Sequence, residues 1–309
     1  MSTVRPRPLA VVVLTFNEQR NLDACLKSVA GWADALYVVD SGSTDATLDV
    51  AARHGALVFT NRFEGHVAQW QWALRSLPLA GHWVLALDAD QAVTPELRDD
   101  LSRRLPSWEV PGSPCGAYVN RRQVFRGRWI RHGGYYPKYL LKLFRHEAVS
   151  LDAADLVDHH FIVAGATAIL TGDLIEDNGN EAEIAVWIAK HNRYAALQAL
   201  DEERRWSSAD APAGRLRGTP DERTLWLKRV WSRLPLYLRP FGYFLYRYFL
   251  RLGFLDGKQG FVFHFMQAFW YRLLVDINRD ELRAAARRGA ATAATDALNR
   301  AGVRAEKHG

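Results

Sequence analysis

A short apolar run, Trp83 to Leu87, ends abruptly in two carboxylates, Asp88 and Asp90. Its length and aliphatic content are typical of a fully buried strand. Because aspartates are rarely buried without a partner, both are expected at the carboxyl end of the strand, facing a polar group. One interpretation is a divalent cation held by these oxygens together with substrate phosphates. The other is two solvated acids before a helix that starts at Thr94-Pro95.

The first hundred residues alternate between apolar runs and amphipathic stretches. Apolar residues spaced three and four apart predict a helix after the first run. A second helix is expected to end at His54-Gly55, and a third spans 66–77 before Pro78. The strands are expected at residues 9–14, 36–39, 57–59 and 83–88. Strands that alternate with helices predict an α/β fold with a mostly parallel sheet and right-handed crossovers.

Two polar loops follow the first two strands, Thr15–Glu18 and Asp40–Asp45. Together with Asp88–Asp90 they are expected to converge on one edge of the sheet, where ligands bind in open α/β folds. Asp40 and Glu18 are interpreted as ligand contacts in preference to turn residues. The chain lacks the glycine-rich signatures of the common dinucleotide and ATP folds. The remaining loop residues, interpreted as caps of the following helix, are Ser43, Thr44 and Asp45.

Three segments, Leu14–Glu18, Val39–Thr47 and Leu87–Asp90, resemble the successive motifs of family 2 glycosyltransferases with the GT-A fold. The resemblance implies a nucleotide-diphosphate sugar donor, with a UDP-sugar favoured, Mg²⁺ or Mn²⁺, and inversion at the anomeric carbon. It implies that Asp88 and Asp90 hold the ribose and the metal–diphosphate. The residues it assigns to the nucleoside are Thr15, Asn17, Glu18 and Asp40. Gln71, or its neighbour Gln69, is a candidate for lining the donor pocket, and helix packing explains either glutamine equally well.

An inverting transferase needs a base that takes the proton of the acceptor hydroxyl. The family carries an acid-and-histidine element in the region where this chain reads Val157-Asp158-His159-His160. Asp158 is the preferred base, and His159 is the alternative because its ordinary pKa lies near neutrality. His160 is assigned to the phosphate or the metal. A structural role remains the alternative for each histidine.

The middle of the chain carries further charged residues. Arg121, Arg122 and Arg145 flank two expected strands and are predicted to face phosphates. The acidic stretch Thr171–Asn180, which includes Asp173, Glu176 and Asp177, is interpreted as a solvated loop in preference to a wall of an acceptor site.

The last third is dense in aromatic and basic residues over 234–254 and 261–275. Charges interrupt both stretches, so a transmembrane helix is not expected. Such stretches suit a membrane interface, and the alternative is a homo-oligomer interface. Segments such as Leu252–Lys258 resemble the end of bacterial family 2 enzymes that build cell-surface polysaccharide, including the lipopolysaccharide-core glucosyltransferase type. The bases expected at an anionic leaflet are Lys228, Arg229, Arg233, Arg239, Arg247 and Arg251.

A net charge of +6 favours an anionic partner, and no nucleic-acid-binding motif is present. Two cysteines argue against a disulfide scaffold. The expected organisation is a nucleotide-sugar-binding half over 1–105, an acceptor-binding half over 106–206, a linker over 207–223, membrane-interface or oligomerisation helices over 224–280 and a tail over 281–309.

The predicted activity is hexose transfer to a lipid-linked or saccharide acceptor in cell-envelope polysaccharide biosynthesis. The predicted location is the cytoplasm, peripheral at the inner face of the cell membrane. The alternatives are a sugar nucleotidyltransferase on a similar fold and a non-catalytic, membrane-associated relative that binds nucleotide sugars.

Overall fold

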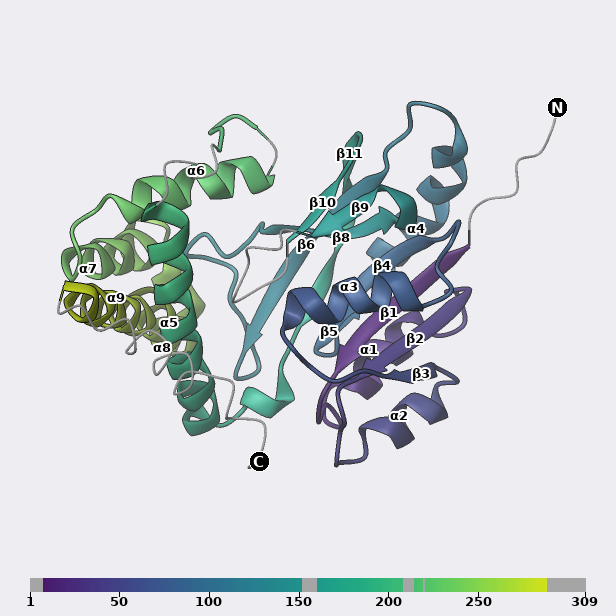
Figure 1. Ribbon diagram of the computed structural model, residues 1–309, viewed down its shortest axis with the longest axis horizontal. Coiled ribbons are helices and arrows are strands. Elements are labelled where there is room, and N and C mark those ends of the chain that lie inside the picture. The colour runs from purple at the N-terminus through teal and green to yellow at the C-terminus, as the bar shows by residue number, and fades with distance from the viewer. Residues whose placement is uncertain (1–7, 152–159, 208–213, 219, 288–309) are drawn as a thin grey trace. The chain divides into compact units, whose positions relative to one another are not determined.

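The computed structural model describes residues 8–151, 160–207, 214–218 and 220–287 (Figure 1). The chain divides into two compact units. Unit 1 comprises residues 1–131 and 135–180, and unit 2 comprises residues 132–134 and 181–309.

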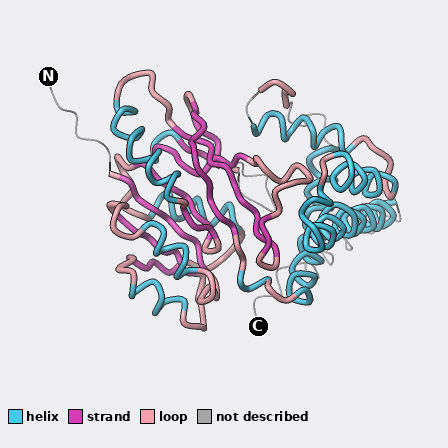
Figure 2. Tube along the Cα trace, turned by 180° about the vertical axis from the view of Figure 1, so that it is seen from behind, coloured by secondary structure: helices cyan, strands magenta, loops and turns pink. Residues whose placement is uncertain are grey.

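Within the described residues, unit 1 is built on a nine-stranded mixed sheet in the order β3-β2-β1-β4-β8-β6-β11-β5, with β7 beside β6. Figure 2 draws the strands in magenta and the helices in cyan. The first four strands run parallel to one another, β8 is antiparallel to β4 and β6, and β11 is parallel to β6. The strands are β1 (Leu9–Thr15), β2 (Ala35–Asp40), β3 (Leu57–Thr60), β4 (Trp83–Asp88), β5 (Gln91–Val93), β6 (Gly116–Phe125), β7 (Arg128–Trp129), β8 (Tyr139–Arg145) and β11 (Thr167–Glu176). A separate antiparallel pair is formed by β9 (Val149–Leu151) and β10 (Phe161–Val163).

Helices cover both faces of this sheet. Alternation along β1 sends Val11 and Val13 to a core shared with α1, α2 and α4, whereas Ala10 and Val12 reach a second core with α3. The helices are α1 (Leu22–Val29), α2 (Thr47–Arg53), α3 (His66–Ser76) and α4 (Pro95–Arg104), with short 3₁₀ turns η1 (Leu105–Glu109), η2 (His146–Ala148) and η3 (Gly179–Glu181). This architecture confirms the predicted α/β, GT-A-like class.

The acidic stretch interpreted as a solvated loop is largely strand β11, so that interpretation is wrong up to Glu176. The strand contains an irregularity between Ile169 and Asp173, where the pairing with β6 shifts register. Gly172 lies there with a φ of +88°, and a Cβ atom at that position would stand 2.3 Å from the backbone nitrogen of Leu97. Gly172 therefore belongs to a bulge in β11 that lets α4 pack closely.

Unit 2 is helical in its described part. Its elements are α5 (Ile184–Ser207), α6 (Pro220–Ser232), α7 (Leu238–Leu245), the π-helical η4 (Tyr246–Leu250), the 3₁₀ turn η5 (Gly253–Asp256), α8 (Gly257–His264), the π-helical η6 (Phe265–Trp270) and α9 (Tyr271–Arg287). The expected linker thus overlaps the last residue of α5 and the start of α6, and the first residues of the expected tail continue α9. Among the described helices, none combines the length and the apolar content that a bilayer crossing requires.

Buried ion pairs hold α5, α7 and α9 of unit 2 together. Arg239 donates from Nε to Asp276 Oδ1 at 2.7 Å and from Nη2 to Glu202 Oε2 at 3.2 Å. Arg279 donates to Glu202 Oε2 at 2.7 Å and to Glu203 Oε1 at 2.6 Å. The expectation that Arg239 faces lipid headgroups is wrong, because its side chain is fully buried in these pairs.

Replacing Asp276 by asparagine should destabilise unit 2, because the Arg239 guanidinium would stay buried with one carboxylate fewer. Breaking a buried pair typically costs about 3–5 kcal/mol, so calorimetry should show a clearly lower melting temperature. The matched control is Asp280→Asn, one turn further along α9, where an exposed carboxylate accepts from the Tyr237 hydroxyl at 3.0 Å. Equal melting temperatures for the two variants would contradict a stabilising role for the buried pair.

Candidate functional site

The loops that follow β1, β2 and β4 lie at one edge of the unit 1 sheet. In the parallel registers Thr15 pairs with Asp40, and Leu14 pairs with Asp88. The predicted convergence of these three polar loops is therefore confirmed by the strand pairing itself.

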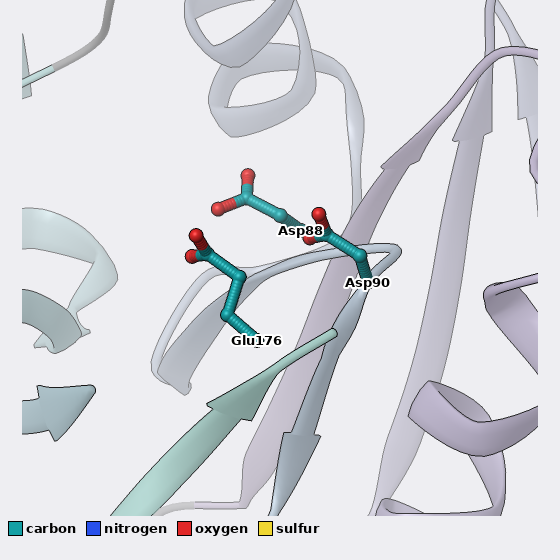
Figure 3. A group of neighbouring side chains, drawn as sticks. All are labelled: Asp88, Asp90 and Glu176. Carbon is teal, nitrogen blue, oxygen red and sulfur yellow. The ribbon is translucent and has the colours of Figure 1, made fainter. Parts of the chain in front are cut away.

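Asp88, Asp90 and Glu176 form an oxygen cluster at this edge. One carboxylate oxygen of each lies within 4.8 Å of one from each of the others, and Figure 3 shows the three groups turned toward one another. Asp88 ends β4, Asp90 lies in the turn to β5, and antiparallel pairing of β5 with β11 places Glu176 opposite Gln91. Glu176 was not among the predicted ligands. The sequence feature that could have identified Glu176 as a ligand is its position directly after the apolar residues Leu174 and Ile175, at the end of a strand.

Amide and basic side chains position two of these carboxylates. The buried Gln91 donates from Nε2 to Glu176 Oε2 at 2.9 Å and accepts the Asp88 N–H at 3.2 Å. Lys142 Nζ donates to Asp88 Oδ2 at 2.8 Å, and Arg121 Nη1 donates to Glu176 Oε1 at 3.0 Å.

The chemistry of the oxygen cluster fits a hard divalent cation. Mg²⁺ and Mn²⁺ prefer oxygen ligands, and Mg²⁺ is usually bound through few carboxylates plus phosphates and water. The sulfur of Cys25 lies 3.7 Å from the Asp88 carbonyl oxygen. Burial, together with the nearby Asp90 and Asp88 carboxylates, raises the pKa of the Cys25 thiol far above its ordinary value.

Asp40 organises two of the loops through its carboxylate. Oδ2 accepts the N–H groups of Gly42 and Ser43 at 2.9 and 2.8 Å. Oδ1 accepts the hydroxyls of Thr15 and Ser43 at 3.0 and 2.5 Å. Asp40 is only 1% exposed, so these four hydrogen bonds give it a structural role in holding the loops together. A direct contact between Asp40 and the nucleoside stays a prediction.

Asn17 and Glu18 join the same network. Asn17 has a φ of +55°, and its Oδ1 accepts the Thr44 N–H at 2.8 Å. The Glu18 carboxylate accepts from Asn21 at 2.6 Å and from Asn180 at 3.1 Å. These contacts fix the first loop, and the nucleoside-binding roles of Thr15, Asn17 and Glu18 stay predictions.

The expected caps of α2 divide into two groups. Asp45 accepts the Thr47 N–H at 3.0 Å from just outside α2, whose N-cap residue is Ala46. Ser43 and Thr44 instead bind the first loop, since Ser43 Oγ accepts the Asn17 N–H at 2.8 Å.

Gln69 and Gln71 occupy different environments on α3. Gln69 is buried; it accepts from Asn61 Nδ2 at 2.8 Å and donates to Ser41 Oγ at 3.2 Å, so it fastens neighbouring loops. Gln71 is half-buried, and its contact with the donor stays a prediction.

Arg145 does not lie near the oxygen cluster, and its predicted phosphate contact is wrong. Because β8 runs antiparallel to β4, Arg145 pairs with Trp83 at the opposite end of β4, where its guanidinium stands 5.2 Å from the indole centroid. The same reversal carries Lys142 to Asp88. Arg122 bonds Asp173 at 2.5 Å, which leaves its predicted phosphate contact untested.

The two candidates for the catalytic base, Asp158 and His159, lie outside the described residues. His160 directly precedes β10 and does not belong to the oxygen cluster as defined among the described residues. Its assignment to metal or phosphate stays a prediction.

Residues 10–160 match the family model described as Glycosyl transferase family 2. A protein of Rickettsia bellii (strain RML369-C), named as an uncharacterized glycosyltransferase, is 33% identical over 101 residues, which cover 33% of this chain and 34% of that protein. The matched part of the chain thus spans about a third of this curated relative.

Solved structures give more distant likenesses. Glucosyl-3-phosphoglycerate synthase from Mycobacterium tuberculosis, in complex with Mn²⁺, UDP and glucosyl-3-phosphoglycerate, is 19% identical with a TM-score of 0.44, covering 68% of this chain and 83% of that one. Staphylococcus aureus TarS 1-349 in complex with UDP is 14% identical with a TM-score of 0.42, covering 91% and 92%. Both likenesses are too distant to assign a ligand to this chain.

Replacing Asp40 by asparagine should destabilise unit 1 without any ligand present. The new amide nitrogen cannot accept a hydrogen bond, so at least one buried donor loses its acceptor, at a cost of about 1–3 kcal/mol. Differential scanning calorimetry should show a lower melting temperature than for Asp49→Asn, which changes an exposed carboxylate on α2. If both variants melted like the unaltered chain, the loop-organising role of Asp40 would be wrong.

Proposed function

We propose that this chain is a family 2 glycosyltransferase that moves a hexose from a nucleotide-diphosphate sugar to a saccharide or lipid-linked acceptor, with inversion. The observation that carries the proposal is the oxygen cluster of Asp88, Asp90 and Glu176. Asp88 and Asp90 lie at the carboxyl end of the parallel strand β4, inside the region that matches the family, whereas Glu176 lies beyond that region at the end of β11. An edge of this kind is where α/β proteins bind nucleotides.

In this proposal Asp88, Asp90 and Glu176 hold Mg²⁺ or Mn²⁺. The bound cation supplies positive charge to the leaving diphosphate. Gln91 keeps Glu176 oriented, since its amide bridges that carboxylate and the Asp88 backbone. The loops organised by Asp40 provide the wall on which the nucleoside lies, with Thr15, Asn17, Glu18 and Gln71 as its proposed contacts.

Acceptor activation is proposed for Asp158, with His159 as the alternative, and His160 is proposed to face phosphate. One of the first two would take the proton from the acceptor hydroxyl as that oxygen attacks the anomeric carbon, so that the nucleoside diphosphate leaves. Holding both substrates in line contributes through orientation.

A sugar nucleotidyltransferase would use the same cluster but attack phosphorus. The products separate the two reactions, since sugar transfer releases a nucleoside diphosphate and nucleotide transfer releases pyrophosphate. A non-catalytic relative would bind nucleotide and release neither product when given donor, cation and a membrane extract as the acceptor source.

The test is a thermal-shift screen of UDP-, GDP-, dTDP- and CDP-sugars with Mn²⁺ or Mg²⁺, because binding to the folded state raises its stability. The solved structures above hold UDP, and one also holds Mn²⁺, so this pair is the first probe. We expect stabilisation by one nucleotide sugar in the presence of cation. The absence of any shift across the screen would contradict the proposal.

Asp90→Asn should remove the cation-dependent shift and lower sugar transfer at least about a hundredfold, while the fold is kept. One unit of charge and a strong ligand oxygen are lost from the cluster, and cation-assisted steps depend on both. The matched control, Asp99→Asn on the exposed side of α4, should behave like the unaltered chain. Full transfer activity in Asp90→Asn would refute its assigned role.

We further propose that unit 2 lies on an anionic membrane surface at the inner face of the cell membrane, where cell-envelope polysaccharide is assembled. Its aromatic cluster consists of side chains that are between 38% and 76% exposed: Tyr237, Leu238, Phe241, Leu245, Tyr246, Phe249, Leu250, Leu252, Phe254, Leu255, Phe261 and Phe265. Ring contacts around Tyr248 link Phe249, Phe254 and Phe261 within it. An exposed apolar surface of this kind is a mark of membrane or protein contact.

Positive charge in unit 2 favours anionic lipid as the partner that the aromatic cluster contacts. Exposed bases occur in the same elements or beside them, namely Lys228, Arg233, Arg251 and Lys258. Each contributes about 1 kcal/mol near an anionic leaflet. A homo-oligomer interface is the alternative, and its core would instead be depleted of charge.

Leu250→Glu should reduce co-sedimentation with phosphatidylglycerol vesicles roughly tenfold, because it removes one inserted leucine and adds a negative charge. Leu250 is 76% exposed, and the matched control is Leu57→Glu on β3, where the side chain is 57% exposed. Equal vesicle binding by the two variants would contradict the membrane proposal. A concentration-dependent dimer that Leu250→Glu dissociates would favour the oligomer instead.

A further inference from the structure

Two of the three carboxylates in the oxygen cluster are paired with cationic side chains of unit 1 itself. The Lys142 ammonium lies 2.8 Å from Asp88 Oδ2, and the Arg121 guanidinium lies 3.0 Å from Glu176 Oε1. The Lys142 side chain is 5% exposed and that of Arg121 is 15% exposed, so water screens neither charge well.

Both bases are fixed by strands. Lys142 lies on β8, which pairs with β4 next to Asp88, and Arg121 lies on β6, where its N–H donates to the Lys138 carbonyl at 2.9 Å. Moving either charge out of the cluster would break an ion pair whose basic partner is largely buried, since the Lys142 and Arg121 side chains are only 5% and 15% exposed. These bases are therefore lasting counter-charges of the cluster.

The formal charges of these five side chains leave a single net negative charge. A divalent cation bound by Asp88 and Glu176 would lie a few ångströms from the positive charges of Lys142 and Arg121. The repulsion between these positive charges and the cation weakens cation binding. A bound diphosphate offsets this repulsion, because it brings negatively charged oxygens that complete the coordination shell of a hard cation.

We infer that Lys142 and Arg121 are positioning residues that make cation binding depend on the nucleotide diphosphate. Alone, the cation binds weakly; with the diphosphate, the two bind tightly together. The inference rests on the proposed function. It also explains why two basic side chains, Lys142 and Arg121, lie at a site for a cation. A purely structural role for Lys142 predicts that its removal changes stability and leaves this coupling unaltered.

The test is titration of the full chain with Mn²⁺, followed by electron paramagnetic resonance, with and without UDP. In Lys142→Met we expect Mn²⁺ alone to bind about tenfold tighter, within the range by which neighbours of metal ligands alter affinity. The factor by which UDP tightens Mn²⁺ binding should fall by the same amount if the affinity for Mn²⁺ in the ternary complex is unchanged. Lys27→Met, which changes an exposed lysine on α1, is the matched control and should reproduce the unaltered chain.

Unchanged Mn²⁺ affinity and unchanged coupling in Lys142→Met would overturn the inference while the proposed function stands. If the unaltered chain binds no Mn²⁺ even with UDP or the other nucleoside diphosphates, the proposed function itself fails. Should Lys142→Met not fold, Arg121→Gln decides by the same titration. Tighter binding of Mn²⁺ alone would then support the inference, and unchanged affinity would refute it.

Discussion

The parallel registers that join β1 to β2 and β4 are the constraint on which the rest of unit 1 depends. Parallel strands bring their carboxyl ends to one edge, so the loops that follow Thr15, Asp40 and Asp88 must meet there. The apolar interiors of these strands stabilise the sheet through two cores, one on each face. The polar side chains gather at the carboxyl ends of these strands, where Thr15 and Asp40 are themselves buried.

This part of the fold could be predicted from the sequence because its signals are local. Each apolar run, the helix after it and the polar loop between them lie within about thirty residues of one another, as βαβ units do. The positions of the first four strands and the meeting of the loops after β1, β2 and β4 followed from these signals. The carboxylates Asp88 and Asp90 were found for the same reason.

The residues that were missed depend on pairing between distant segments. Glu176 reaches the oxygen cluster because β11 pairs antiparallel with β5, a partner some 80 residues earlier in the chain. The sheet changes from parallel to antiparallel at β8, and no local pattern announces that change. Because β8 runs antiparallel to β4, Lys142 lies beside Asp88 and Arg145 lies at the opposite end of β4. In unit 2, spacing alone likewise did not distinguish the buried Arg239 from the exposed Arg233.

The oxygen cluster and its basic partners describe a site whose charge is nearly balanced before any ligand arrives. Such balance lets carboxylates lie close together within a folded sheet edge, because like charges at this spacing repel strongly when they are unpaired. The Gln91 amide adds orientation without adding charge. In the proposed function, this site would take a ligand pair of opposite charges, namely a cation and a diphosphate.

The most direct measurement is crystallographic: a crystal grown with Mn²⁺ and UDP, and an anomalous difference map collected at the manganese absorption edge. The account predicts one strong peak between the carboxylates of Asp88, Asp90 and Glu176, with the diphosphate beside it. A manganese ion bound elsewhere while this cluster shows no peak would contradict the account.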